Sequence, residues 1–189
     1  MRIVLGSFVF FFFMSCSATT DDYQSSVDAG WLAYEEAQFT DASFLFVGAL
    51  AIDPSGTEAW NGLGWSRLRR DSLDGAADAF QTGSALSTPT ADLYAGWGFV
   101  LNAQKNYGGS NTQTISALSA DPQWQFVHEA GLTSVDLKIL LAENYFALGQ
   151  FSQSLTAVQS VNVDFTADVS NTDGQAELAA EIERLKLIN

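Results

Sequence analysis

The sequence predicts an all-α protein built as a solenoid of stacked helical hairpins, and three observations support this fold class. Glycine recurs every 34 residues, at Gly30, Gly64 and Gly98. Helix-forming residues dominate the middle of the chain, where β-branched alternation is scarce. An amphipathic segment, residues 175–186, lies near the C-terminus. The chain has 189 residues, of which 47% are hydrophobic and 16% charged, so it can form a packed core.

The period extends beyond the glycines to columns of aromatic and small residues. A repeat of this length holds two helices of about a dozen residues and two turns. Small residues recur where two helices must approach closely, and large residues fill the spaces between them. The recurring positions are Trp31, Trp65 and Phe99; Ala42, Ala76 and Ser110; Ala49, Gly83 and Ala117; and Asp53-Pro54 with Asp121-Pro122.

These columns resemble the tetratricopeptide repeat (TPR), and the second unit carries the resemblance most clearly. Trp60, Leu63 and Gly64 match its first-helix W-x-x-L-G pattern, and Ala76 and Phe80 match its second-helix small and aromatic positions. The resemblance implies a right-handed α-solenoid of about four TPR-like helical hairpins plus a C-terminal capping helix. The expected units are 23–54, 55–88, 89–122 and 134–162.

The third unit departs from the pattern in its second helix. Ser110 and Thr114 stand where the repeat usually has alanine and an aromatic residue. We therefore expect this helix to be the least well packed and to start late, after Gly109.

An insertion, residues 123–133, precedes the fourth unit. In strict register the fourth glycine position would fall at Leu132, but the best match is Ala142, ten residues later. Insertions in solenoids map to loops on one face, often a functional one. The alternative is a longer connection whose aromatic residues pack against the neighbouring unit. The inserted residues that carry side-chain chemistry are Trp124, Phe126, Val127 and His128.

Residues 163–189 are predicted to form a linker and a capping helix. Leu178, Ile182 and Leu185 recur at helical spacing, and Asp173 is a plausible N-cap. A helix of this kind covers the last hydrophobic face of a repeat array.

The N-terminus resembles a bacterial lipoprotein signal peptide, expected to span residues 1–15. Residues 3–14 form an apolar run that is too short for a helix across the roughly 30 Å hydrocarbon core. The run ends next to Cys16, the single cysteine of the chain, which the resemblance implies is acylated after cleavage. An ordinary secretory cut after Ala18 is the alternative.

The signal peptide implies a cell-envelope protein on the periplasmic side of a membrane. Residues 16–22 are expected to be a short tether between the lipid and the fold. Ser17 is not the aspartate that signals retention in the inner membrane of some bacteria, which favours the outer membrane.

Composition argues against nucleic-acid binding, catalysis and metal binding. The formal net charge is −14, from 8 basic and 22 acidic residues, and nucleic acids require clustered Lys and Arg. Sequence motifs for zinc, calcium or dinucleotide binding are not found. His128, the single histidine, could at most form an acid/base pair with Glu129. We therefore expect no enzyme activity, no cofactor and no metal.

Binding remains as the expected activity, since in the repeat family the first helices line a concave face. The leading hypothesis is a scaffold that binds a partner polypeptide there, through aromatic and apolar anchors. A glycan- or peptidoglycan-binding protein that uses exposed tryptophans is the alternative. The same rings could instead pack against neighbouring helices. The resemblance places eight residues on this face: Trp31, Tyr34, Trp65, Leu68, Arg69, Phe99, Asn102 and Phe146.

Overall fold

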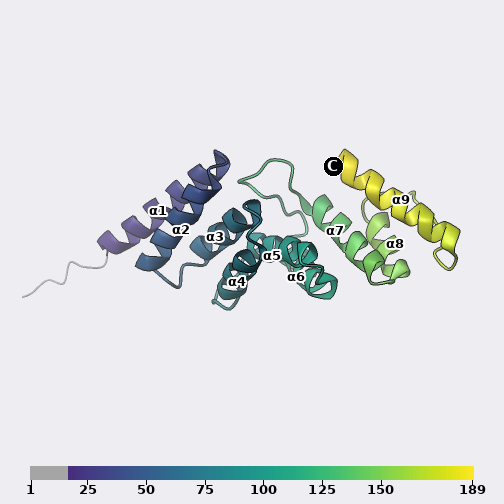
Figure 1. Ribbon diagram of the computed structural model, residues 1–189, viewed down its shortest axis with the longest axis horizontal. Helices are drawn as coiled ribbons and strands as arrows, with labels where there is room; N and C mark the ends of the chain where they lie inside the picture. The colour runs from purple at the N-terminus through teal and green to yellow at the C-terminus, as the bar shows by residue number, and fades with distance from the viewer. Residues whose placement is uncertain (1–16) are drawn as a thin grey trace, which may run out of the picture.

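The computed structural model describes residues 17–189, and within this range it has nine α-helices and no named strand (Figure 1). The helices are α1 (Ser17–Glu35), α2 (Phe39–Ile52), α3 (Thr57–Arg69), α4 (Leu73–Ser84), α5 (Ala91–Ala103), α6 (Tyr107–Ala120), α7 (Ser134–Ala147), α8 (Phe151–Gln159) and α9 (Thr172–Ile188).

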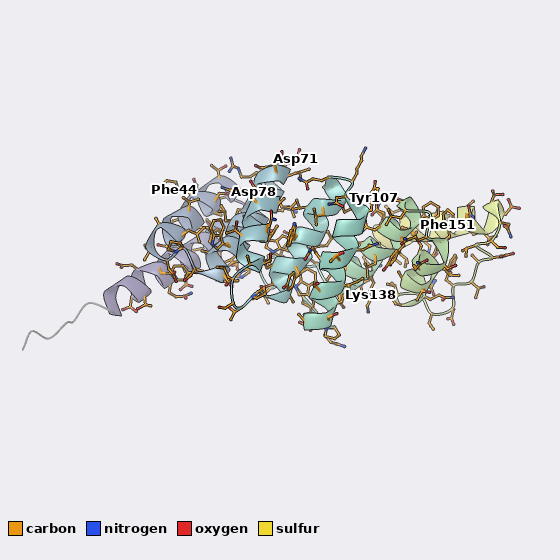
Figure 2. The ribbon with its side chains drawn as sticks, turned by 90° about the horizontal axis from the view of Figure 1, so that it is seen from below. Phe44, Asp71, Asp78, Tyr107, Lys138 and Phe151 are labelled. Carbon is orange, nitrogen blue, oxygen red and sulfur yellow. The ribbon has the colours of Figure 1, made fainter. Side chains whose placement is uncertain are left out.

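The helices pair into four consecutive hairpins that stack side by side in an arched row, and α9 packs against the last pair (Figure 1). Seen edge-on, the row runs from the first hairpin, which carries Phe44, to the fourth, which carries Phe151 (Figure 2). This arrangement confirms the predicted all-α solenoid with a capping helix.

Glycines allow the phenyl rings of the second helices to wedge between adjacent first helices. A Cβ atom added to Gly30 would lie 2.7 Å from the ring of Phe46, and the same ring also fills the space beside Gly62. A Cβ atom on Gly64 would lie 2.5 Å from the ring of Phe80. Because both rings are fully buried, the 34-residue glycine period is a packing requirement.

The turn inside each hairpin places one residue in the left-handed backbone conformation. Its φ angle is 59° at Ala37, 58° at Asp71, 60° at Lys105 and 71° at Gly149. The first three positions follow the 34-residue period, although none of them is glycine. Side chains with a Cβ atom adopt this conformation at a cost in free energy, so the repeat geometry overrides local preference here.

Two predictions for the third unit are wrong. Helix α6 begins at Tyr107 rather than after Gly109, because the side chain of Asn106 caps it and accepts a hydrogen bond from the Gly109 amide at 3.1 Å. The helix is also tightly packed. Ser110 and Thr114 are fully buried, and the Ser110 hydroxyl donates to a backbone carbonyl of α5 at 2.7 Å. That bond satisfies the polar atom that replaces alanine.

The fourth unit repeats this hydrogen bond in the displaced register. Ser154 donates to the carbonyl of Ala142 at 2.7 Å, as Ser110 donates to the carbonyl of Gly98. Ala142 therefore occupies the position that glycine holds in the earlier units, as the sequence comparison indicated. Helix α7 begins at Ser134 behind a capping box formed by Thr133 and Asp136.

Helix α9 covers the end of the array. Leu178, Ile182 and Leu185 are buried against the fourth hairpin, as predicted. The N-cap prediction was wrong: Asn171 caps the helix, because its side chain accepts from the Gly174 amide at 2.9 Å. Asp173 instead lies in the first turn, where its charge is favourable to the helix dipole.

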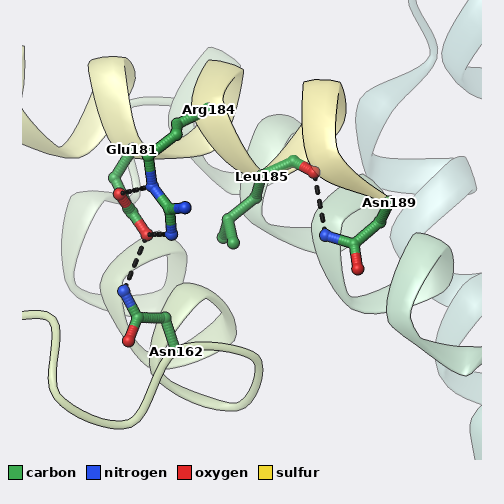
Figure 3. Close-up of polar contacts among 5 residues, drawn as sticks. All are labelled: Asn162, Glu181, Arg184, Leu185 and Asn189. Atoms are coloured by element: carbon green, nitrogen blue, oxygen red, sulfur yellow. Dashed lines mark hydrogen bonds and ion pairs between the residues drawn. The ribbon is translucent and has the colours of Figure 1, made fainter.

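A polar cluster fastens α9 to the chain that follows α8 (Figure 3). Asn162 donates to Glu181 at 2.8 Å, and Arg184 donates to both oxygens of the same carboxylate at 2.6 and 2.7 Å. The Arg184 guanidinium holds the pKa of Glu181 below its usual range. Asn189 closes the helix by donating to the carbonyl of Leu185 at 2.9 Å (Figure 3).

Residues 17–22, which belong to the expected short tether, make up the first turns of α1. The Ser26 hydroxyl donates to the carbonyl of Asp22 at 3.0 Å within this helix. The predicted signal peptide, residues 1–15, and the predicted lipidation site, Cys16, lie outside the described residues. Of the helices that are described, none combines the length and the apolar character needed to cross a bilayer.

Candidate functional site

The first helices of the hairpins present matching rows of side chains on the concave face. One row consists of Trp31 on α1, Trp65 on α3 and Phe99 on α5, spaced by the 34-residue period. The centroids of the Trp65 and Phe99 rings lie 6.1 Å apart. One helical turn further along lies a second row, from Tyr34 through Leu68. We call the row of Trp31, Trp65 and Phe99 the aromatic stripe.

Part of the insertion turns back over this stripe, and we call residues 124–129 the covering segment. In Figure 1 the chain between α6 and α7 leaves the row of helices and reaches toward the turn between α1 and α2. Trp124 and Phe126 are buried while Gln125 and Val127 are exposed, which is the alternation of an extended strand. The Phe126 amide donates to the carbonyl of Leu132 at 2.9 Å, so the segment is one arm of a small hairpin.

Aromatic stacking attaches the covering segment to the stripe. The ring of Phe126 stacks on Trp65 with centroids 4.2 Å apart and planes 20° apart. It also meets Trp31 and Tyr34 edge-on, at 6.0 and 5.9 Å. The imidazole of His128 stacks on Trp31 at 3.7 Å with planes 1° apart. The rings of Phe126 and His128 therefore each lie against at least one ring of the stripe, and such pairs stabilise beyond the area they bury. The ring of Trp124 stacks on Phe126 of the same segment, with centroids 6.3 Å apart.

Polar contacts attach the far end of the covering segment. Glu129 accepts hydrogen bonds from the Tyr34 hydroxyl at 2.8 Å and from the Arg69 guanidinium at 2.9 Å. Nδ1 of His128 lies 2.8 Å from a carboxylate oxygen of Glu35. Burial and the hydrogen bond to Glu129 raise the pKa of Tyr34. His128 and Glu129 thus face different partners and do not form an acid/base pair.

Two half-buried carboxylates lie beside the covering segment. Glu58 accepts a hydrogen bond from the Trp31 indole at 2.7 Å, and Asp92 accepts one from the Trp124 indole at 2.5 Å. Burial raises the pKa of both carboxyl groups above their usual range. Asn61 lies between Glu58 and Trp65 on the same face of α3, and it is fully buried. Within the described residues, neither polar atom of its side chain has a hydrogen-bond partner.

The covering segment decides which predicted binding residues are accessible. Trp31, Tyr34 and Trp65 are only 5%, 2% and 1% exposed. The insertion does pack its aromatic residues, but against the first and second units as well as the adjacent third. The glycan-binding alternative depended on exposed tryptophans, and in this structure the two tryptophans of the stripe are covered.

Beyond the covering segment the concave face stays hollow, and we call this part the open groove. A first hollow of about 340 Å³ adjoins a second of about 380 Å³, and both are lined by Phe99 and Leu132. The first is completed by Trp65, Leu68, Arg69 and Glu129, and the second by Asn102, Asp136, Ile139, Leu140, Glu143 and Lys186.

Comparison with known proteins supports the fold assignment. No family model matches the sequence, and no curated protein matches it. Among solved structures, YrrB, described as a TPR protein with an unusual peptide-binding site, superposes with a TM-score of 0.68 at 14% identity, over 93% of this chain and 95% of that one. MamA superposes with a TM-score of 0.62 at 16% identity, over 87% and 82%. The chain has the tetratricopeptide-repeat fold.

A tetratricopeptide repeat protein from Parabacteroides merdae superposes as well, with a TM-score of 0.62 at 10% identity, over 88% of this chain and 60% of that one. At identities this low the likeness establishes the TPR fold alone. Function is therefore argued from the groove itself.

The open groove of this TPR array is lined by five of the eight predicted binding residues. Trp65, Leu68, Arg69 and Phe99 line one hollow together. Asn102 lines the next, and its side chain donates to Asn144 at 2.7 Å. Phe146 lies apart from them. Its ring meets that of Phe151 on α8 edge-on at 5.1 Å, and it lines a separate hollow of about 170 Å³ between α7 and α9.

Several groove residues were not anticipated from the sequence, although signals for them exist. Glu58 and Asp92 are separated by the 34-residue period and precede the aromatic row by two helical turns. Leu132 and Glu129 belong to the insertion, where a ring-bearing side chain at every second position, Trp124, Phe126 and His128, indicates a strand. Across residues 17–189 no group of His, Cys, Asp or Glu side chains is arranged to hold a metal ion.

Proposed function

We propose that this chain is a non-enzymatic scaffold that binds a partner polypeptide in the open groove. The observation that carries the proposal is the pair of adjoining hollows that share Phe99 and Leu132. Together they form a concave surface whose shared wall, Phe99 and Leu132, is apolar. Such a surface can accept one or two apolar side chains of an extended or helical segment.

The charges around the open groove can orient the partner. Arg69 and Glu129 lie at the first hollow, paired at 2.9 Å, and Lys186 lies 3.5 Å from Glu143 at the second. Each ion pair is partly exposed, so each charge remains available to a polar group of the partner. The open groove therefore offers apolar side chains that can anchor a partner, and charged side chains that can select between partners of different charge.

The proposal includes a location on the periplasmic side of a bacterial envelope, with acyl chains on Cys16 as the anchor. It is supported by the resemblance of residues 1–16 to a lipoprotein signal and by the acidic net charge of −14, which suits a soluble surface domain. Mass spectrometry of the mature N-terminus tests it. A peptide that begins at acylated Cys16 is expected, and one that begins at Thr19 would contradict it.

The binding proposal is tested with the full chain and two open-groove variants, Phe99→Ala and Leu132→Ala. A partner captured from envelope extracts is identified and purified, and its affinity for each variant is then measured. Both variants are expected to weaken binding at least tenfold. Phe44→Ala is the matched control, because Phe44 is exposed on α2, outside the groove. Equal affinities for all four proteins would overturn the proposal.

A further inference from the structure

We propose that the face beneath the covering segment is a second polypeptide site, which accepts an extended segment with aromatic side chains at alternate positions. Residues 124–129 are its internal occupant, and a partner segment of the same chemistry replaces them. This inference rests on the proposed function only in that the concave face receives polypeptide.

The covering segment contacts the helices in the manner of a bound peptide. Side chains at positions 124, 126 and 128 point into the groove while those between them are exposed, as Val127 is at 78%. The main-chain hydrogen bonds of the covering segment are made within its own hairpin. For example, the Ser134 amide donates to the carbonyl of Trp124 at 2.7 Å. Side-chain contacts alone attach it to α1, α3 and α5, so a foreign strand could reproduce them.

The covered face retains polar groups that the covering segment does not satisfy. Asn61 is buried beside Trp65 with its amide nitrogen and oxygen unpaired among the described residues. An unpaired buried amide costs free energy, and an incoming main chain that approached it could supply both a donor and an acceptor. Glu58 and Asp92 each have an indole donor, but their partial burial raises the pKa of both carboxyl groups and so disfavours their charge. The covered state is therefore imperfect, which permits exchange.

The covering segment can leave without breaking a helix. Helix α6 ends at Ala120 and α7 begins at Ser134, so the whole insertion is outside regular structure. Gly131, with a φ of 100°, provides the turn that folds the segment back. The capping box of Thr133 and Asp136 holds the start of α7 through contacts that do not involve residues 124–129.

The occupant defines the chemistry of the partner. Indole N–H and imidazole groups of the covering segment meet the carboxylates Asp92 and Glu35, and its carboxylate Glu129 meets Tyr34 and Arg69. A fitting partner strand therefore has aromatic or basic side chains at three alternate positions, followed by an acidic one. Acidic residues at the first three positions would face Glu35, Glu58 and Asp92 and be rejected.

The test uses a fluorescent peptide with the sequence of residues 121–130 and the full chain carrying Trp124→Ala, Phe126→Ala and His128→Ala together. This variant is expected to bind the peptide at least tenfold more tightly than the unchanged chain. A peptide with serine in place of its Trp and Phe is expected not to bind. The matched control, Gln125→Ala with Val127→Ala, alters exposed side chains and should bind as weakly as the unchanged chain. A folded triple variant without binding would overturn the proposal.

Hydrogen exchange on the unchanged chain tests, independently of that variant, whether the covering segment leaves the face. The amides of Phe126 and Ser134 are hydrogen-bonded within the covering hairpin. They are expected to exchange at least tenfold faster than the amides in the middle of α3, and faster still when the peptide is added. Exchange at the rate of α3, unaffected by peptide, would show that the segment opens only on global unfolding and would overturn the proposal.

The outcomes separate this inference from the proposed function. Adding Trp65→Ala to the triple variant is expected to abolish peptide binding, because Trp65 lies on the covered face. Adding Phe99→Ala instead is expected to leave peptide binding unchanged. If the triple variant does not bind the peptide while the envelope partner still depends on Phe99 and Leu132, only the second site fails. If the peptide binds but no partner depends on Phe99 or Leu132, only the proposed function fails.

Discussion

The phenyl ring of Phe126 stacks on the indole of Trp65, with centroids 4.2 Å apart, although the two residues belong to the insertion and to the second hairpin. Because Phe126 is buried, Phe126→Ala is expected to reduce the free energy of unfolding by about 3 kcal/mol. Chemical denaturation monitored by tryptophan fluorescence measures this loss. Val127→Ala, at an exposed neighbour, should change stability by less than about 0.5 kcal/mol. Equal effects of the two changes would contradict the placement of the segment.

Glu58 gives the fold a defined pH dependence. Burial raises the pKa of its carboxyl group, so the folded state takes up a proton at a higher pH than the unfolded state does. The unchanged chain should therefore gain stability relative to Glu58→Gln as pH falls from 7 through the folded pKa. At neutral pH Glu58→Gln should have the higher melting temperature, because its amide oxygen still accepts from Trp31 without a buried charge. Parallel melting curves from pH 7 to 4 would contradict this.

Gly64 and Gly48 are a matched pair for the packing role of the repeat glycines. A Cβ atom on Gly64 would lie 2.5 Å from the buried ring of Phe80, whereas at Gly48 no atom of the described residues lies within 4 Å. Gly64→Ala is expected to destabilise by about 1–3 kcal/mol through overpacking. Gly48→Ala should stabilise by about 0.5–1 kcal/mol through helix propensity. Thermal unfolding of both variants checks the opposite signs.

The left-handed turn residues support a second pair of changes with opposite signs. Lys105→Gly should stabilise the fold by about 0.5–1 kcal/mol, because φ is 60° at this position and a side chain with a Cβ atom adopts this conformation at a cost in free energy. Gly149→Ala should destabilise by about 1 kcal/mol, since φ is 71°. Denaturant midpoints are the measurement. A loss of stability in Lys105→Gly would show that the turn is not strained.

Asn61→Leu replaces the unpaired buried amide by an apolar side chain of similar shape. The change removes two polar atoms that have no partner within the described residues, so stability is expected to rise by about 1 kcal/mol. Calorimetry of the full chain measures the shift. Asn111→Leu is a less favourable comparison, because of the polar atoms of the Asn111 side chain only the oxygen is both buried and unpaired within the described residues. A strong loss of stability in Asn61→Leu would mean that the amide has a partner, such as a buried water.

The predictable part of this molecule is the part that repeats. The positions of Gly30, Gly64 and Gly98 located the first helices because a phenyl ring has to fit against each of two of them and a threonine against the third. Errors of two or three residues arose at helix ends, as at Asn171 and Asn106, where a single side-chain hydrogen bond decides where the helix begins.

The covered half of the candidate site could not be derived from the repeat. The position of Trp31 on the concave face follows from the period, but its burial depends on His128, 97 positions further along the chain. No local propensity reports such a contact. The alternation of Trp124 and Phe126 indicates a strand, but the hydrophobic pattern does not indicate which surface the strand covers. The site prediction was therefore incomplete, because the place where the irregular covering segment packs could not be derived from the sequence.

In a stack of hairpins each unit contacts only its neighbours, so small changes of angle at each interface add up along the stack and make it flexible. Here Tyr34 and Glu129 are joined by a hydrogen bond across 95 positions of sequence. That bond and the stacked rings beside it act as a brace between the first hairpin and the chain entering α7. The arch is therefore expected to be stiff from α1 to α6 and to bend mainly at the joint with α7, which is where the second hollow of the open groove lies.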